Sequence, residues 1–435
     1  MIIAPSKVKR ITASFSIQQV TILKQQMLGW VNQFNICSFL DNHQYHSTYQ
    51  TVECLAAAGA VQLFRAEKNI LNQLNTFSQQ HKDWLFGHIS YDCKNDIEPL
   101  HSSHPDHIGF PDIFFFQPET VLQLTETKLT ISSLTKDPEI IFEEISNSPW
   151  TMDHGPWTVS IEPRITKEEY INTIRQLLKH IQRGDCYELN FCQEFFATGV
   201  VIDPLSVYAQ LTAISPNPFS CFYKLDNRYL LCASPERYLQ KKGNKITSQP
   251  IKGTFKRNTE SAEADEELRL QLQQSEKDRS ENVMVVDLVR NDLSRVCKEG
   301  TVKVDELFGV YSFPQVHQMI STISGELKEG IEFADILKAT FPMGSMTGAP
   351  KRRVMELIEQ YEKTKRGIYS GAVGYINPEK DFDFNVVIRS ILYNATDQYL
   401  AYLVGGGITF YSDPEKEYEE CLLKAKAIKE VLQGR

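Results

Sequence analysis

Residues 371–404 read GAVGYINPEKDFDFNVVIRSILYNATDQYLAYLV, and this stretch predicts three consecutive core strands. Its apolar runs cover residues 371–376, 384–393 and 399–404, and segments containing Asn, Asp, Pro and Lys separate them, as turns do. An amphipathic segment over 415–432 then predicts a single long C-terminal helix. Consecutive strands followed by a helix do not match a repeated strand–helix–strand unit.

Helices and strands also alternate irregularly upstream of this stretch. Residues 166–183 begin with Thr-Lys-Glu-Glu, which can form a capping box, and they carry apolar residues at helical spacing. The segments 276–295 and 350–361 predict two more helices, whereas 187–196 and 220–225 predict strands. Together these elements predict an α+β fold.

The composition excludes several classes of protein. The 435 residues carry a net charge of −9 and 42% of them are hydrophobic, so we expect a large core and no nucleic-acid partner. The nine cysteines form no Cys-x-x-Cys pair, which indicates reduced thiols rather than a disulfide framework. The longest apolar stretch, 399–411, is too short to cross a bilayer, and the sequence shows no signal peptide. We therefore expect a cytoplasmic chain without a membrane partner.

A change in composition near residue 155 predicts a boundary between two regions. Pro149, Gly155 and Pro156 lie close together, and Pro and Gly interrupt regular structure. We expect an N-terminal region over 1–155, which contributes strands to a shared body, and a catalytic region over 156–435.

Two predicted helices each carry a pair of acidic residues spaced three apart. Asp278 and Glu281 lie on one helix, Glu417 and Glu420 lie on the other, and Lys424 follows Glu420 by one turn. Like charges at this spacing repel each other, and a divalent cation between the helices would remove the repulsion. Mg²⁺ prefers such oxygen ligands. The alternative is two solvated, charged helix faces.

Residues 248–254, Ser-Gln-Pro-Ile-Lys-Gly-Thr, contain a candidate nucleophile. Pro250 stiffens the chain before Lys252, and Gly253 allows a tight turn after it. A lysine that is presented in this way and shielded from water has a lowered pKa and can act as a nucleophile. The alternative is an ordinary turn lysine.

Other segments indicate contacts with a small anion. The glycine-rich run 341–351 leads into a helix with Pro350 in its first turn, where free N–H groups can bind a carboxylate. Three glycines within 404–409 allow the backbone to approach a ligand closely. Arg389 stands in an apolar run, where a charge needs an anionic partner. An ordinary turn or a structural ion pair is the alternative in each case.

The order of the motifs along the chain is more informative than any one of them. They are GDCYELN (184–190), SPER (234–237), PIKGT (250–254), ENVMVVDLVRNDL (281–293), GSMTGAPK (344–351), YSGAVGY (369–375), GGGI (405–408) and the acidic helix that ends with Lys424. In this order they resemble the chorismate-utilising enzymes, which include anthranilate, aminodeoxychorismate, isochorismate and salicylate synthases. The resemblance covers residues 165–432 and is faint across 1–150. It implies two large β-sheets packed at a steep angle, with helices outside and the site between the sheets.

The resemblance also implies roles for individual residues. Glu281, Glu417 and Glu420 would hold Mg²⁺, with Asp278 where relatives often carry Glu, and the metal would bind the ring carboxylate of chorismate. Arg389 and the glycine backbone would hold the enolpyruvyl carboxylate. The residues implied for substrate binding are Thr254, Ser345, Tyr369, Arg389, Gly405, Gly406, Gly407 and Lys424, and those implied for catalysis are Lys252, Glu236 and His317, the last beside the ring.

Pro-Ile-Lys-Gly-Thr resembles the aminodeoxychorismate synthases, whereas anthranilate synthases look like Pro-Ile-Ala-Gly-Thr. The resemblance therefore implies amination of chorismate at C4, which feeds para-aminobenzoate and folate synthesis. Lys252 would attack C2, and ammonia would then attack C4 and displace it. Glu236 would protonate the departing hydroxyl and later act as a base. Ammonia would come from a separate glutamine amidotransferase subunit, because the sequence contains no glutaminase nucleophile signature.

Two other functions stay open at this point. Anthranilate synthase component I is disfavoured by Lys252, and a non-catalytic, chorismate-binding regulatory relative would lack the acids or Lys424. Isochorismate-forming relatives carry a lysine base where this chain has Glu188 and Asn190. Glu188 also departs from the Gln that is usual in the aminating enzymes, and the sequence assigns it no role.

Overall fold

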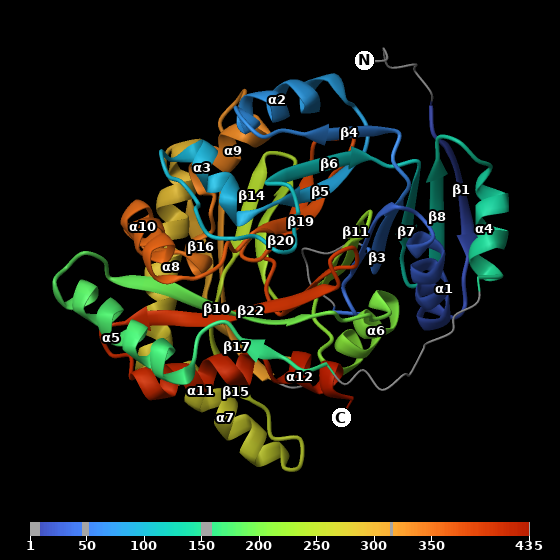
Figure 1. Ribbon diagram of the computed structural model, residues 1–435. Helices are drawn as coiled ribbons and strands as arrows, with labels where there is room; N and C mark the ends of the chain where they lie inside the picture. The colour runs from blue at the N-terminus through green and yellow to red at the C-terminus, as the bar shows by residue number, and fades with distance from the viewer. Residues whose placement is uncertain (1–8, 46–51, 149–158, 314–315, 435) are drawn as a thin grey trace.

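Two large β-sheets form the centre of the molecule, and helices cover their outer faces (Figure 1). The computed structural model describes residues 9–45, 52–148, 159–313 and 316–434. Within these ranges, no helix is long and apolar enough to cross a membrane. The predicted α+β class, with two large sheets and helices outside them, is confirmed.

The larger sheet has 12 strands. Its longest members, β10 and β22, are 11 residues each and pair along their whole length across the middle of the molecule (Figure 1). The strands in spatial order are β1 (Ile11–Ser16), β8 (Lys128–Ser133), β7 (Thr120–Leu124), β3 (Cys54–Ala58), β2 (Ile36–Asp41), β11 (Phe219–Leu225), β12 (Arg228–Ser234), β21 (Ser390–Asn394), β22 (Tyr399–Thr409), β10 (Glu188–Thr198) and β18 (Gly348–Ala349), with β9 (Glu162–Pro163) beside β10.

The smaller sheet has 10 strands. In spatial order they are β15 (Ile251–Lys256), β17 (Val316–Glu326), β14 (Lys245–Gln249), β13 (Arg237–Lys242), β20 (Phe382–Asn385), β19 (Ala372–Ile376), β5 (Leu85–Ile89), β6 (Ile113–Gln117) and β4 (Gln62–Arg65), with β16 (Lys303–Ser312) beside β17.

Three of the helices, α5, α8 and α10, follow the sequence-based predictions. α5 begins with the predicted capping box, in which the Thr166 hydroxyl accepts from the Glu169 N–H and the Glu169 carboxylate accepts from the Thr166 N–H. The helices are α1 (Val20–Asn32), α2 (Ile70–Gln80), α3 (Lys94–Ile97), α4 (Pro138–Ser146), α5 (Lys167–Gln182), α6 (Pro204–Ile214), α7 (Ala262–Gln274), α8 (Glu276–Val296), α9 (Phe333–Thr340), α10 (Lys351–Tyr361), α11 (Pro414–Lys424) and α12 (Lys426–Gln433), with 3₁₀ turns η1 (Tyr91–Cys93) and η2 (Gly344–Met346).

The prediction of one C-terminal helix over 415–432 is wrong, because α11 and α12 are separate helices. Ala425 lies between them with ψ of −7°, and its N–H donates to the carbonyl of Leu422, only three residues back. This tighter turn interrupts the α-helical hydrogen bonding between the two helices.

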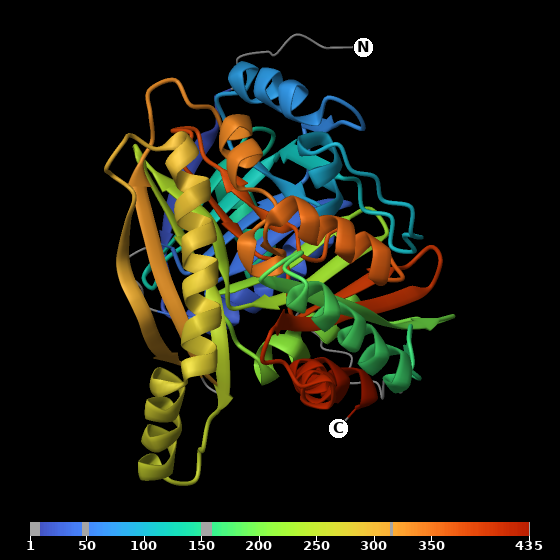
Figure 2. The same cartoon turned by 90° about the vertical axis from the view of Figure 1, so that its left-hand side faces the viewer.

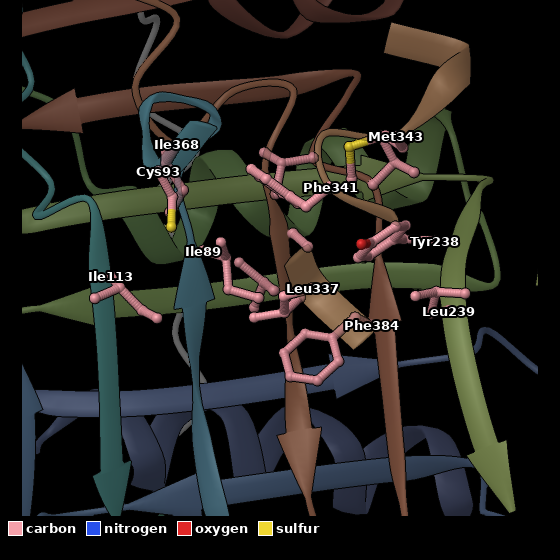
Figure 3. Close-up of a cluster of buried hydrophobic side chains, with 14 of the residues drawn as sticks. Ile89, Cys93, Ile113, Tyr238, Leu239, Leu337, Phe341, Met343, Ile368 and Phe384 are labelled. Atoms are coloured by element: carbon pink, nitrogen blue, oxygen red, sulfur yellow. The ribbon is translucent and has the colours of Figure 1, made fainter. Parts of the chain in front are cut away.

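Apolar side chains fill the space between the two sheets and beneath the helices. Figure 3 shows Ile89 of β5, Ile113 of β6 and Phe384 of β20 gathered around Leu337 of α9. A second cluster lies on the other face of the larger sheet, under α1, α5, α6 and α12. Full burial of each large apolar side chain contributes about 1.5–3 kcal/mol, so these clusters hold the sheets and helices in place.

The chain passes from one sheet to the other within the stretch predicted as a single strand over 384–393. β20 ends at Asn385 in the smaller sheet, and β21 begins at Ser390 in the larger one, so the prediction of one continuous strand is wrong. Arg389 lies at the crossing with φ of 51°, a left-handed conformation that breaks the strand. Such a conformation costs about 1–3 kcal/mol outside glycine and is often found at functional sites.

The described part of the N-terminal region contributes strands to both sheets. β1, β2, β3, β7 and β8 enter the larger sheet, whereas β4, β5 and β6 enter the smaller one. The predicted boundary near residue 155 lies outside the described residues, so the division into 1–155 and 156–435 stays a prediction.

Candidate active site

A cavity of about 770 Å³ lies between the two sheets. Its walls come from β15 and β17 of the smaller sheet, from β22 of the larger sheet and from the helices α8 and α11. Figure 2 shows α8 running along the strands of the smaller sheet, with the C-terminal helices seen nearly end-on beside it. The cavity brings together these predicted site residues: Glu236, Lys252, Thr254, Asp278, Glu281, Ser345, Tyr369, Arg389, Gly405, Gly407, Glu420 and Lys424.

A β-bulge places Lys252 in the cavity wall. The register between β15 and β17 shifts between Ile251 and Thr254, and Gly253 within the shift has φ of 90°. Glycine reaches this conformation without steric cost, and an extra residue in one strand redirects the neighbouring side chains. The prediction of a tight turn at Gly253 is therefore corrected to a bulge within a strand.

The ammonium group of Lys252 donates a hydrogen bond to Glu188 Oε1 on β10. Burial alone lowers the pKa of Lys252, but the charges of Glu188, Glu281 and Glu236 outweigh burial and hold the pKa above its usual range. The expectation of a lowered pKa is wrong for this arrangement, because it considered shielding from water and not the acids around the lysine.

Glu236 provides a buried acid on the loop between β12 and β13. Burial raises the pKa of this carboxyl to about 7, while the Ser345 hydrogen bond and the Lys252 charge oppose the rise. Ser345 Oγ donates to Glu236 Oε1 at 2.5 Å. An acid whose pKa lies near neutral pH can both donate and accept a proton efficiently.

Arg389 and Tyr369 also line the cavity. No hydrogen bond or ion pair joins the Arg389 guanidinium to any residue that the structure describes. Burial lowers the pKa of Arg389 to about 10, against the attraction of Glu236, so the group stays charged at neutral pH. A charged group facing a cavity without a partner is a binding site for an anion. Tyr369 is buried, with its hydroxyl 3.7 Å from Cys192 Sγ.

Three carboxylates converge on the ammonium group of Lys277, in the first turn of α8. Lys277 Nζ lies 3.8 Å from Glu281 Oε1, 3.6 Å from Glu417 Oε1 and 3.8 Å from Glu420 Oε2. The two helices thus bring acids from both predicted pairs together around one cation. Asp278 is not part of this group, because its carboxylate accepts a hydrogen bond from the hydroxyl of Ser275, the N-cap residue of α8.

The chemistry of the acid group fits a divalent cation, but the carboxylates are not in ligating positions while Lys277 lies between them. Glu281 Oε1 is buried and has no hydrogen-bond partner among the described residues, and burial raises the pKa of Glu281 to about 7. Burial also raises the pKa of Glu417, while the charge of Lys424 lowers the pKa of Glu420 to about 2. The raised pKa values mean that the charged forms of Glu281 and Glu417 are destabilised by burial. A divalent cation would stabilise these charged forms more than the single charge of one ammonium group does. Lys277 occupies the middle of the group, and within the described ranges no three acidic, His or Cys side chains are spaced to ligate a metal.

The predicted glycines continue β22 instead of forming a turn. A Cβ atom at Gly406 would lie 3.2 Å from Glu417 Oε2 and 3.6 Å from Lys424 Nζ, so this position separates the strand from α11. Lys424 donates a hydrogen bond to the carbonyl of Gly405 at 3.1 Å. Gly406 and Glu417 therefore lie behind the cavity wall, next to residues that face the cavity.

His317 is the predicted catalytic residue that the structure does not bring into the cavity. Its Nε2 lies 3.0 Å from Asp265 Oδ1 and its Nδ1 lies 2.8 Å from Ser312 Oγ, so α7 and β16 enclose it. Neighbouring side chains on a strand point to opposite faces, and Gln318 lines the cavity instead. Neither the nitrogen nor the oxygen of the Gln318 amide has a partner in the described residues. We therefore replace His317 with Gln318 among the candidate site residues, and alternation along the strand is the signal that would have identified it.

The N-terminus of α10, which we considered as a carboxylate site, does not contribute to the cavity wall. Lys351, its first residue, pairs with Asp292 of α8 at 2.5 Å. Within the glycine-rich run, Ser345 contacts the cavity by donating a hydrogen bond to Glu236.

Comparisons with known proteins agree with this geometry. A family model described as a chorismate binding enzyme matches residues 35–430. The chain belongs to the chorismate-binding enzyme family. The aminodeoxychorismate synthase component 1 of Escherichia coli K12 is 39% identical over 348 residues, which cover 79% of this chain and 75% of that relative.

Relatives in the chorismate-binding family differ in length and in the activity that their names state. A probable chloroplastic aminodeoxychorismate synthase of Oryza sativa subsp. japonica is 43% identical over 271 residues, which cover 62% of this chain and 30% of the relative. The chain thus matches less than a third of that plant relative. The anthranilate synthase component 1 of Saccharolobus solfataricus is 33% identical, over 89% of this chain and 90% of the relative.

Solved structures from the chorismate-binding family share the fold. Anthranilate synthase component I from Streptococcus pneumoniae matches with a TM-score of 0.73 at 24% identity, covering 100% of this chain and 94% of that one. The menaquinone-specific isochorismate synthase of Escherichia coli matches with a TM-score of 0.75 at 18% identity, covering 98% of this chain and 96% of that one.

Proposed function

We propose that this chain aminates chorismate at C4 to give 4-amino-4-deoxychorismate, which supplies para-aminobenzoate and folate synthesis. One observation carries the proposal: Lys252, a nucleophile, and Glu236, an acid with a pKa of about 7, line the same buried cavity. The names of the Escherichia coli and plant relatives support it.

The reaction assigns separate tasks to the two residues. The neutral amine of Lys252 attacks C2, the C1–C2 and C5–C6 double bonds move to C1–C6 and C4–C5, and the C4–O bond breaks. Glu236 donates a proton, so that the hydroxyl leaves as water. Ammonia then attacks C4, the double bonds return to C5–C6 and C1–C2, and the C2–N bond breaks so that Lys252 leaves as an amine. Glu236 regains its proton from the new ammonium group at C4.

Charged side chains around the cavity orient the substrate. Arg389 has no partner among the described residues and binds the enolpyruvyl carboxylate through charge-assisted hydrogen bonds. Tyr369, Gly405 and Gly407 line the same cavity. Lys424 reaches the ring from α11.

Mg²⁺ is part of the proposal. Glu281, Glu417 and Glu420 would hold the ion, which when bound offsets the charge of the ring carboxylate. Lys277 has to withdraw from these acids as the ion binds, since its ammonium group lies within 4 Å of all three. Asp278 lies on the same helix but is not among the proposed ligands, since its carboxylate accepts a hydrogen bond from Ser275.

We further propose that ammonia comes from a separate glutamine amidotransferase subunit. The name "component 1" of the bacterial relatives supports a second component. A cytoplasmic location is also part of the proposal, and the nine free cysteines support it.

The deciding experiment identifies the product. The chain is incubated with chorismate, Mg²⁺ and ammonium, and the products are separated by liquid chromatography and identified by mass spectrometry. We expect 4-amino-4-deoxychorismate without release of pyruvate. Anthranilate with pyruvate would instead establish the activity named for the Saccharolobus relative, and isochorismate would mean that water outcompetes ammonia. If no product forms, the assay is repeated with a glutamine amidotransferase and glutamine.

Two variants test the role of Lys252. Lys252→Ala is expected to lose turnover and any covalent adduct, because it removes the attacking amine. Lys256→Ala removes an exposed lysine from the same strand and is expected to keep both. Full activity of Lys252→Ala would exclude Lys252 as the nucleophile.

A further inference from the structure

Glu188 is buried at the start of β10 and faces the candidate nucleophile. It is 2% exposed, its Oε1 accepts the hydrogen bond from Lys252, and its Oε2 has no partner among the described residues. A carboxylate so placed is held in position by its strand, which pairs with β22 on one side and β18 on the other. Its free oxygen can still take up a proton.

Gly407 allows the two charged groups to meet. A Cβ atom at this position would lie 2.7 Å from Lys252 Nζ and 2.8 Å from Glu188 Oε1. Both distances are shorter than real contacts of such atoms, so any larger residue would push the pair apart. The cavity wall is therefore shaped around the contact between Glu188 and Lys252.

The proposed reaction needs a neutral Lys252, yet the surrounding acids favour its protonated form. The carboxylates that act on the charge of Lys252 are those of Glu188, Glu236, Glu281 and Glu420. Among these four, Glu188 alone forms a hydrogen bond with the lysine in the described residues. Glu236 is engaged by Ser345 and must keep its own proton for the departing hydroxyl.

We propose that Glu188 takes the proton from Lys252 before the amine attacks chorismate and returns it after the lysine has left. This inference rests on the proposed function. The proton moves along the existing N–H···O hydrogen bond, which leaves a neutral amine and a neutral carboxyl. The amine then forms the bond to C2 while water leaves from C4 with the proton of Glu236. When ammonia displaces the lysine, the free amine recovers its proton from Glu188. Glu188 is thus a positioning residue that acts through Lys252.

The test measures covalent adduct formation in the absence of ammonia. Wild type and Glu188→Gln are each mixed with chorismate and Mg²⁺ at several pH values, and the reactions are quenched at set times. Mass spectrometry of the intact proteins then measures the fraction that carries the adduct. Glutamine keeps the shape and can still bond to Lys252, but it cannot take a proton. We expect the variant to form the adduct on the order of 100-fold more slowly at neutral pH. The ratio of the variant rate to the wild-type rate should rise about tenfold per pH unit, since the lysine must then lose its proton to water.

Taking this ratio cancels the titration of Glu236, which both proteins share. A ratio that stays near one at every pH would overturn the proposal, and so would a lower rate with an unchanged pH dependence, which indicates a structural role only. If Glu188→Gln does not fold, Glu188→Asp decides the question, because it keeps the carboxyl. Its rate ratio is expected to be independent of pH, and a ratio that climbs with pH would contradict the proton transfer.

The same data separate this inference from the proposed function. Failure of the wild type to form any adduct or 4-amino-4-deoxychorismate would remove the proposed function itself. A wild type that forms both, beside a Glu188→Gln variant with the same rates and pH dependence, would remove the role of Glu188 alone.

Discussion

Replacing Ser345 with alanine should move the pH dependence of the first chemical step to higher pH. The Ser345 hydroxyl donates to Glu236 Oε1 at 2.5 Å, and this bond favours the charged carboxylate. Without it, the pKa of Glu236 rises above its value of about 7. A hydrogen bond to a charged group contributes about 1.5–3 kcal/mol, and 1.36 kcal/mol corresponds to one pKa unit, so the shift should be about 1–2 units.

Adduct formation with chorismate in the absence of ammonia measures this shift. The wild-type rate should fall as pH rises through about 7, because the proton of Glu236 is lost. In Ser345→Ala the acid keeps its proton longer, and the fall should begin about 1–2 units higher. Ser248→Ala is the matched control, because Ser248 Oγ donates to the carbonyl of Tyr238, away from the cavity wall. A fall at the same pH in wild type and Ser345→Ala, or one at lower pH in the variant, would refute the assignment of Glu236 as the acid.

Two further substitutions test the binding of the metal and of the substrate. Lys277→Met removes the cation that competes with Mg²⁺. Each of its three ion pairs contributes about 0.2–1 kcal/mol, which sums to about 0.6–3 kcal/mol, so Mg²⁺ should bind about 3- to 150-fold more tightly by calorimetric titration. Weaker Mg²⁺ binding in this variant would mean that Lys277 does not occupy the metal position. Arg389→Ala should raise KM for chorismate roughly 10- to 100-fold with a smaller effect on kcat, because it removes a charged hydrogen-bond donor. An unchanged KM, with an unfolding midpoint like that of the wild type, would exclude Arg389 from substrate binding.

Local signals explain why the helices α5, α8 and α10 could be predicted. The residues that form the capping box of α5 lie within a few positions of one another, and so do the apolar residues that give α8 its helical spacing. The errors arose where two elements succeed each other without a polar break. The apolar run over 384–393 contains a crossing between two sheets, and the amphipathic segment over 415–432 contains a break at Ala425. Periodicity alone reveals neither the crossing nor the break.

The sequence by itself determined which chemical groups are present and in what order. Lys252 in Pro-Ile-Lys-Gly-Thr, the acidic pairs and the glycines of β22 were identified by their motifs, and the cavity contains almost all of them. Motifs are sufficient to identify these residues, because the identity and order of the residues in a motif do not depend on the fold.

Only the tertiary structure decided which groups touch. Lys252 and Glu188 are 64 positions apart in the sequence, and their contact raises the pKa of the lysine where shielding from water would lower it. Lys277 likewise lies among the three acids because α8 approaches α11 in the folded chain. Alternation on β17 placed Gln318 rather than His317 in the cavity. Electrostatic energies and pKa values depend on distances of a few ångströms between distant parts of the chain, and folding sets those distances.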